Sequence, residues 1–433
     1  MIAAVLRLTC ACLLASTVAT AGTLSVGPGQ TYATIAAASA AAHDGDIIEI
    51  AAGTYHEAVS FAANQLTVRG VGGRPVIDMT GMTISNGKAI FVTDGADITI
   101  ENLEFTGAAV TDQNGAGIRW EGPGSLTVRG CVFRSNENGI LGGGAAHPEN
   151  VALIQNNEFV DNGRGNVGFT HSVYFGDADT VTFTGNWSHA LWPGGADIGH
   201  LFKCRAHHTS VLYNRLTAED NPSSYEINIP QGGEAYVIGN LIEQKAGGQR
   251  IMISFGDGDG TQYTGSKLYV VANTFVSEAA GNATFIRTTQ ADAQITAIDN
   301  LLVGPGTLAS GGVVTMMNNL ATTAPGFVDQ ASYDYHLAPG SPAIDTGGDP
   351  GMALAPTSQY VHPAGTETRK VVGATIDIGA YEYGNVPTDG EDTAPTGDGA
   401  PATSAPSGCG CRTHDAPGGL LLLLVALRLR RRR

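Results

Sequence analysis

The sequence predicts an all-β fold, a right-handed parallel β-helix solenoid, and three observations lead to it. The first is a recurring pattern, seen in 211–216 (VLYNRL), of apolar residue, two spacers, asparagine, one spacer and apolar residue. Its asparagine position is filled at Asn157, Asn186, Asn214, Asn240, Asn273, Asn300 and Asn319. Leu103 and Cys131 hold the same register upstream, and the steps from Leu103 onward are 28, 26, 29, 28, 26, 33, 27 and 19 residues. Such a period is typical of a stacked repeat architecture.

The other two observations identify the kind of repeat. Each unit contains short apolar alternations, such as those at 181–183 and 268–270, separated by Gly, Asn and Asp, which is the pattern of short strands and turns. No long helical pattern occurs between residues 44 and 330. Because asparagine tolerates the left-handed backbone region, we expect each repeated asparagine at a sharp corner, with its amide hydrogen-bonded along the stack. The prediction is about nine or ten coils; a β-sandwich with coincidental spacing is the alternative.

The chain divides into four predicted parts. Residues 1–21 contain Arg7, an apolar run and a small-residue end, which predicts a secretory signal peptide. Residues 22–383 form the β-helix domain, in which 31–43 is the one clear helical stretch and is expected to cap the first coil. Residues 384–407 are rich in Pro, Gly, Thr, Ser and acidic residues, which predicts a disordered linker. Residues 408–433 are an expected sorting or anchor tail.

The two ends of the domain and the tail resemble known bacterial proteins. The stretch 46–55 (DIIEIAAGTY) resembles the N-terminal edge of the pectate lyase-like β-helix superfamily. The stretches 325–346 and 377–383 resemble the C-terminal segment of secreted β-helix proteins with variable surface anchors, and we expect them to cap the last coil. Cys409-Gly-Cys411, a short apolar run at 418–427 and a terminal arginine cluster resemble the MYXO-CTERM sorting signal of Myxococcota. This resemblance implies export and attachment at the cell surface or outer membrane; an ordinary tail anchor is the alternative.

Composition limits the partners. A net charge of −17 argues against nucleic acid, which needs a basic footprint. An acidic polymer can still bind through a local basic patch. Because the chain has only five lysines, a lysine on a coil is a candidate for such a patch. Only Cys131 and Cys204 lie in the body; they belong to different, non-adjacent coils and are expected to be buried free thiols. We expect a monomer that binds polysaccharide, specifically a polyuronate.

A basic pair marks the candidate site. In 199–206 (GHLFKCRA), inward Phe202 and Cys204 would place Lys203 and Arg205 on the outer face, because strand side chains alternate. The neighbouring coils should then present polar groups beside this pair at about 4.8 Å spacing. The expected outward neighbours are Tyr174, Glu226, Asn228 and Ser254, with His171 and His200 nearby.

The block 171–240 resembles bacterial β-helix proteins related to polysaccharide lyases, with Cys204 where that group would carry serine. β-Elimination needs a cation on the substrate carboxylate, a base for the adjacent C–H and an acid for the leaving oxygen. Arg205 suits the first role and Lys203 the second, while Tyr174 or His200 could be the acid. The predicted catalytic residues are Lys203, Arg205, Tyr174, His200 and Glu226, and the predicted substrate-binding residues are His171, Asn228 and Ser254.

Three alternatives remain open. The pair at 203 and 205 could belong to a structural ladder of salt bridges, and each histidine could be structural. A hydrolase would need two or three acidic groups on one cleft, and Glu226 has no evident acidic partner. A non-catalytic glycan-binding or adhesin-like surface scaffold is the third. No residue is assigned as a metal ligand, although 255–260 (FGDGDG) and Asp177 with Asp179 could bind Ca²⁺, which takes oxygen ligands.

Overall fold

The computed structural model describes residues 21–144, 146–165, 170–191, 199–219, 221–258 and 260–385. The predicted signal peptide, apart from Ala21, lies outside the described residues. The predicted linker after Asn385 and the whole predicted tail also lie outside them. Their predicted roles stay predictions. Among the described residues, no helix has both the length and the apolar character needed to cross a membrane.

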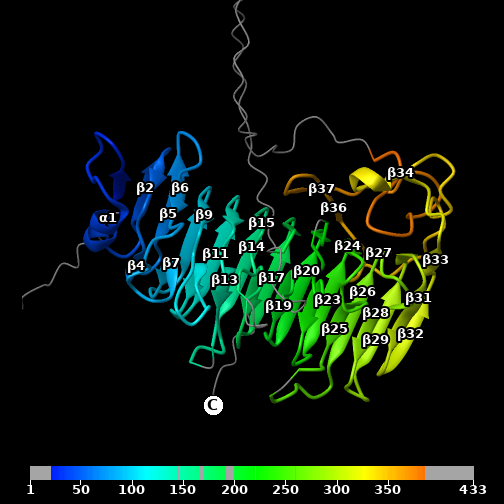
Figure 1. Ribbon diagram of the computed structural model, residues 1–433. Helices are drawn as coiled ribbons and strands as arrows, with labels where there is room; N and C mark the ends of the chain where they lie inside the picture. Colours follow the sequence, from blue (N-terminus) through cyan, green and yellow to red (C-terminus); the bar gives the residue numbers. More distant parts are fainter. Residues whose placement is uncertain are drawn as a thin grey trace, which may run out of the picture. The chain divides into compact units, whose positions relative to one another are not determined.

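Three long parallel sheets wind into a right-handed β-helix, which confirms the predicted fold class (Figure 1). In each coil the chain passes from sheet A to sheet B to sheet C, and then starts the next coil in sheet A. Equivalent strands of successive coils pair in parallel register, so one residue of each coil lies beside its counterpart in the next. The side chains of one register position therefore form a row along the stack.

The strand bounds are as follows. Sheet A contains β1 (Thr23–Val26), β2 (Ile47–Ala51), β5 (Thr67–Val71), β8 (Ile98–Glu101), β11 (Ser125–Arg129), β14 (Val151–Gln155), β17 (Thr180–Thr184), β20 (His208–Leu212), β23 (Glu234–Ile238), β26 (Lys267–Val271), β29 (Gln294–Ile298) and β32 (Val313–Met317). Sheet B contains β3 (Thr54–Tyr55), β6 (Val76–Asp78), β9 (Glu104–Thr106), β12 (Val132–Arg134), β15 (Glu158–Val160), β18 (Trp187–His189), β21 (Arg215–Thr217), β24 (Leu241–Gln244), β27 (Thr274–Ser277), β30 (Leu301–Val303) and β33 (Leu320–Thr322). Sheet C contains β4 (Val59–Phe61), β7 (Ala89–Thr93), β10 (Ala116–Trp120), β13 (Asn138–Gly142), β16 (Val173–Phe175), β19 (Phe202–Cys204), β22 (Ile227–Ile229), β25 (Ile251–Phe255), β28 (Ala283–Thr288) and β31 (Gly306–Ser310).

The stack has the nine or ten coils expected. Within the described residues, sheets A, B and C have 12, 11 and 10 strands, so ten coils contribute a strand to all three sheets. The first coils, formed by residues 23–78, lack the asparagine pattern. Their strands are recognisable only by apolar alternation, as in Ile47–Ala51.

The predicted asparagine ladder exists, but its residues do not make the sharp turn themselves. At the corner between sheets A and B, the Asn214 side chain donates to Asn240 Oδ1 at 3.0 Å, and Asn186 donates to Asn214 Oδ1 at 3.1 Å. The left-handed residue is the one before each asparagine: Tyr213 has φ 54° and Asn156 has φ 55°. The asparagine is needed because its amide satisfies buried backbone groups at the corner, such as Phe183 O.

The interior is a column of apolar side chains. Phe105, Phe133 and Phe159 follow one another in sheet B of successive coils, with ring centroids 5.1 and 4.8 Å apart. This separation is close to the strand spacing of a sheet, so parallel stacking brings these three rings into contact. Phe183 of sheet A and Phe202 of sheet C, both from the next coil, continue the column at 5.8 and 4.8 Å. Cys131 and Cys204 are buried free thiols in this interior, as predicted, and burial raises the pKa of Cys204 to about 11.

The two ends of the stack differ. Helix α1 (Ile35–Ala41) buries Ile35 and Ala38 against the first coil, as expected of a cap, and begins after Thr34, whose hydroxyl accepts the Ala37 N–H at 3.1 Å. The C-terminal segment contains two antiparallel pairs, β34 (Phe327–Asp329) with β35 (Asp334–Leu337), around the short helix η1 (Gln330–Ser332), and β36 (Ser358–Tyr360) with β37 (Thr366–Thr368).

The expectation that this C-terminal segment covers the last coil is wrong. Its apolar side chains, including Tyr335 and Tyr381, pack on the outer face of sheet B against Leu241, Val276 and Leu301. The physical reason is that β24, β27 and β30 carry apolar residues on both faces, so their outer face needs a cover. Met316 of the last coil stays 57% exposed.

Candidate functional site

The candidate site lies on the outer face of sheet C. Parallel register aligns one outward position of every coil from β10 to β28. This row contains Arg119, Leu141, Tyr174, Lys203, Asn228, Ser254 and Arg287. Phe202 and Cys204 point into the core and are fully buried, which confirms the predicted alternation of β19. The predicted neighbours Tyr174 and Asn228 flank Lys203 directly.

Tyr174, Lys203 and Arg205 form one cluster on this face. Arg205 Nε donates to the Tyr174 hydroxyl at 2.9 Å, and Lys203 Nζ lies 4.7 Å from the centre of the Tyr174 ring. A cation at this distance from an aromatic ring is attracted by its negative face. Tyr263, from a later loop, donates its hydroxyl to Arg205 O at 3.2 Å and fixes the backbone there. All three side chains are half-buried, so their conformations are restrained while they still reach solvent.

His171 and His200 lie beneath this cluster rather than beside it. The two rings stack with centroids 4.7 Å apart, and His200 stacks in turn on Tyr225 at 5.0 Å. Both histidines are almost completely buried. Burial lowers the pKa of His200 to about 3, with Lys203 adding to the effect, and burial also holds the pKa of His171 well below its usual value. Both rings are therefore neutral at neutral pH.

These positions correct two expectations. His171 was predicted to bind substrate, but its ring is only 1% exposed and faces Lys203 instead. His200 was considered as the acid, but an imidazole with a pKa of about 3 is not in the imidazolium form, which is the acidic form, at neutral pH. Alternation alone could not show this, because both residues precede their strands, where the backbone bends and side chains do not follow the strand pattern.

The tautomer of His171 bears on Lys203. The backbone N–H of His200 donates to His171 Nδ1 at 3.2 Å, so the proton of the neutral ring is on Nε2. Nε2 lies 3.4 Å from Lys203 Nζ. The Nε2–H of His171 therefore faces the amino group of Lys203.

Glu226 is not on the exposed face, contrary to expectation. It is fully buried, accepts from Ser223 Oγ and from Gln244 Nε2 at 2.9 Å, and burial holds its pKa well above the usual value. Its position just before β22 lets the side chain turn toward Gln244 of β24. A buried, protonated carboxyl with neutral partners is consistent with a structural role.

Ser254 and Asn228 are both in the outward row but are buried by their neighbours. Ser254 Oγ donates to Asp257, which also pairs with Arg287; Arg287 in turn donates to the Tyr225 hydroxyl at 3.1 Å. The sequence reasoning missed Arg287, although its place in an alternating strand one coil after Ser254 could have revealed it. Asp257 of the run 255–260, one candidate for binding Ca²⁺, is therefore held in an ion pair, and Asp259 of the same run lies outside the described residues.

An open cavity of about 460 Å³ lies over the Arg205 end of the cluster. Arg119, Leu141, Tyr174 and Arg205 are among its lining residues and come from four successive coils, and Asp177 lines it from the same coil as Tyr174. Arg119, which sequence reasoning also missed, is held by Glu121 Oε1 at 2.7 Å from its Nε. A second cavity of about 510 Å³ adjoins the first, because Asp177 and Gln231 line both. The two cavities make a polar depression that crosses several coils.

The comparisons with known proteins agree with the fold. The family model for the right-handed β-helix region matches residues 66–242. Among solved structures, the chain is similar to pectate lyase Pel9A, with 14% identity, coverage of 84% of this chain and 97% of that chain, and a TM-score of 0.58.

Two further structures are less similar. An alginate lyase from Paenibacillus sp. str. FPU-7 has 16% identity, coverage of 70% and 99%, and a TM-score of 0.40. A pectin methylesterase from carrot has 13% identity, coverage of 71% and 85%, and a TM-score of 0.32. No curated protein sequence matches the chain significantly. The family-model match and the similarity to Pel9A thus identify the fold as a right-handed parallel β-helix.

Proposed function

We propose that this protein cleaves an acidic polysaccharide by β-elimination, at a site formed by Tyr174, Lys203 and Arg205. The observation that carries the proposal is the Tyr174–Lys203–Arg205 cluster itself. It brings an amine, a phenol and a guanidinium together on one half-exposed face, beside an open cavity. The fold shared with a pectate lyase is compatible with this activity, although the low identity shows only the fold.

Arg205 is the group for the substrate carboxylate. Its guanidinium is always charged and presents several N–H donors in a fixed plane. It lines the cavity, and its orientation is fixed by the bond from Nε to the Tyr174 hydroxyl. Neutralising a uronate carboxylate acidifies the adjacent C–H, which is the first requirement of elimination. Arg119 supplies a second positive group in the same cavity for a neighbouring acidic sugar.

Lys203 is the base and Tyr174 is the acid. Lys203, whose Nζ lies 3.4 Å from His171 Nε2, takes the proton from the carbon beside the carboxylate in its neutral amine form. The C–H electrons form the new C=C bond, and the C–O bond to the leaving sugar breaks. The Tyr174 hydroxyl accepts the Arg205 hydrogen bond, so its own proton points elsewhere and can pass to the leaving oxygen. Lys203 then releases its proton to solvent, and the Tyr174 phenolate takes a proton from solvent.

The shape of the depression suits a polymer. Its lining residues come from coils that stack at about 4.8 Å, so the four coils from β10 to β19 span roughly 14 Å. A chain lying along the stack would contact equivalent positions of successive coils. Export through the predicted leader and attachment through the predicted tail would bring the enzyme to polymers outside the cell.

The test is a polyuronate panel assayed by ultraviolet absorbance, since elimination creates a conjugated double bond and hydrolysis does not. Lys203→Ala should lower kcat by about 10²- to 10⁴-fold, the usual contribution of a general base. Arg205→Lys should lose most activity, because a point charge cannot reproduce the forked grip on a carboxylate. The matched control is Lys267→Ala, which removes an exposed lysine from sheet A and should leave kcat unchanged.

Two outcomes would reject the lyase. If the wild type binds acidic glycans without releasing unsaturated products, the site belongs to a non-catalytic glycan-binding scaffold. If Lys203→Ala chiefly lowers the melting temperature, the cluster is a structural network.

A further inference from the structure

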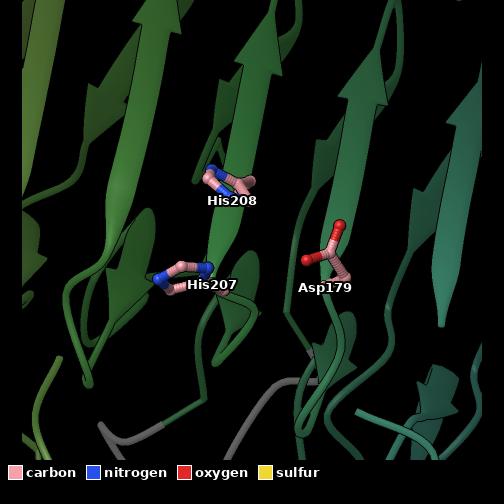
Figure 2. A group of neighbouring side chains, drawn as sticks. All are labelled: Asp179, His207 and His208. Atoms are coloured by element: carbon pink, nitrogen blue, oxygen red, sulfur yellow. The ribbon is translucent and has the colours of Figure 1, made fainter. Parts of the chain in front are cut away.

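We propose that Asp179, His207 and His208 form a binding site for a divalent transition metal ion of the Zn²⁺ class. The three residues lie where the chain passes from sheet C to sheet A, outside the Tyr174–Lys203–Arg205 cluster. One ligand atom from each residue lies within 4.8 Å of the other two. Figure 2 shows the Asp179 carboxylate facing the two imidazole rings, which project from the neighbouring coil. The inference does not rest on the proposed function.

Coil stacking brings these residues together. The His208 N–H donates to Asp179 O at 2.7 Å, and Thr180 of β17 pairs with His208 of β20. Asp179 and His207 each precede the first residue of their strands, so they occupy the same corner on successive coils. Consecutive strand residues normally point to opposite faces. Here His207 precedes β20, so the bend lets both rings project on the outer side.

Neighbouring groups orient two of the three ligands. Thr180 Oγ1 donates to Asp179 Oδ2 at 2.8 Å, which leaves Oδ1 for a metal ion. His208 Nδ1 lies 3.6 Å from Glu234 Oε2, which leaves Nε2 for the metal ion. The Tyr236 hydroxyl donates to Glu234 Oε1 at 3.2 Å and holds that carboxylate in turn. A carboxylate behind a ligating imidazole is the usual second layer of a protein metal site.

The donor set decides the kind of ion. Two imidazole nitrogens and one carboxylate oxygen suit Zn²⁺ and its neighbours in the first transition row. Ca²⁺, the alternative ion for Asp177 and Asp179, takes six to eight oxygen ligands, so a site with two imidazole ligands fits it poorly. Metal–ligand bonds of about 2.0–2.2 Å need ligand atoms roughly 3.3 Å apart. The side chains are partly or fully exposed, so rotation can close the remaining gap.

The site has room for further ligands. Asp179 and His207 line the cavity of about 510 Å³, whose other wall includes Tyr263 and Thr261. The Tyr263 ring lies 4.8 Å from the His207 ring and restrains it from one side. A metal ion bound by three protein ligands would keep an open position toward this cavity, where water or another oxygen ligand can bind. It would also tie one coil to the next, because its ligands come from two coils.

The experiment measures metal binding directly. The whole protein, stripped with a chelator, is titrated with Zn²⁺ by calorimetry and with Co²⁺ by visible absorption. We expect one equivalent to bind, with Co²⁺ bands of a four- or five-coordinate site, and excess Ca²⁺ should not displace it. Zn²⁺ should also raise the melting temperature of the wild type, because a ligand that binds only the folded state stabilises it.

Three variants test the residues. His207→Gln, His208→Gln and Asp179→Asn should each weaken Zn²⁺ binding by at least about tenfold, and Glu234→Gln should weaken it less. The control is His336→Gln, an exposed histidine paired with Asp334 in the C-terminal segment, which should bind like the wild type. The melting temperature of each metal-free variant shows whether it folds like the wild type. Only variants that fold normally are then used to judge whether the three residues bind Zn²⁺. Absence of a bound equivalent, or unchanged affinity in the three variants, would overturn the site.

Discussion

The buried imidazoles of this protein show how surroundings set the charge of one residue type. Burial and, among the described residues, the neighbouring side chain of Lys203 lower the pKa of His171 and His200, and both rings stay neutral. His189 lies on sheet B with Glu158 Oε1 at 3.3 Å and Glu219 Oε2 at 3.2 Å from its ring nitrogens. Burial alone would lower the pKa of His189, but the two carboxylates outweigh burial and raise it. His189 therefore keeps its second ring proton to a higher pH than the other two do.

This difference predicts a pH-dependent stability. A raised folded-state pKa means that the His189 contribution is complete below the unfolded value of about 6.5 and is lost as pH rises through the folded value. His189→Gln should cost about 1–3 kcal/mol near pH 6, where it leaves two carboxylates without their cation. The cost should shrink toward pH 9, and urea unfolding at several pH values measures it.

His43→Gln is the control, because His43 is exposed at the other end of the stack. A His189→Gln cost that stays constant from about pH 6 to pH 9 would show that the ring stabilises by packing on Trp187 rather than by charge.

At the scale of elements, the corner between sheets A and B is the most repetitive part of the molecule. Each asparagine Oδ1 accepts two N–H groups from the asparagine of the preceding coil, one from the backbone and one from the side chain. Each Nδ2 donates to a backbone carbonyl of a preceding coil and to the next asparagine. The ladder thus satisfies polar groups that the bend removes from the regular sheet pattern.

Asn214→Ala should therefore destabilise the stack by more than one ordinary hydrogen bond. It removes the acceptor of two buried Asn186 N–H groups and the donor to Phe183 O. The expected cost is about 2–4 kcal/mol in the free energy of unfolding, measured by urea denaturation. Asn319→Ala is the matched comparison, because Asn319 ends the ladder and is only partly buried, so its cost should be smaller. Equal costs at the two positions would contradict cooperation along the ladder.

At the scale of the whole molecule, the stack is closed at one end and open at the other. Helix α1 covers the first coil, whereas β31, β32 and β33 have exposed side chains and no described strand on their outer edge. In a solenoid each coil contacts only its neighbours, so stability varies along the stack. The last coil should open locally before the middle coils do.

Two identical substitutions test this gradient. Val237 is fully buried in the middle of sheet A, and Val314 is an inward residue of β32 in the last coil, in register with Ala235, and is partly exposed. Val237→Ala should cost about 1–3 kcal/mol, and Val314→Ala less than about 1 kcal/mol, by equilibrium unfolding. Hydrogen exchange of 313–317 should also be faster than that of 234–238. Similar costs and similar exchange would mean that the stack unfolds as a single unit.

The candidate site shows which side-chain orientations strand alternation can predict. It placed Lys203 and Tyr174 side by side on the outer face, because side chains within a strand obey a period of two and successive coils keep register. It failed for Glu226, His171 and His200, which precede their strands, where the bend frees the side chain from that period. Residues at corners are oriented by partners from other coils, such as Gln244 for Glu226, and such pairs have no fixed spacing in the sequence.

The sequence by itself determined the solenoid, its repeat and the ladder, because a coil repeats its own local pattern and needs only its neighbour to bury its apolar face. It also located the basic pair, since two cations in one alternating strand must lie outside. Only the tertiary structure decided the protonation of the buried histidines, the covering of sheet B by the C-terminal segment and the meeting of Asp179 with His207 and His208. These features depend on burial and on distances between coils, which turn lengths set and local patterns do not encode.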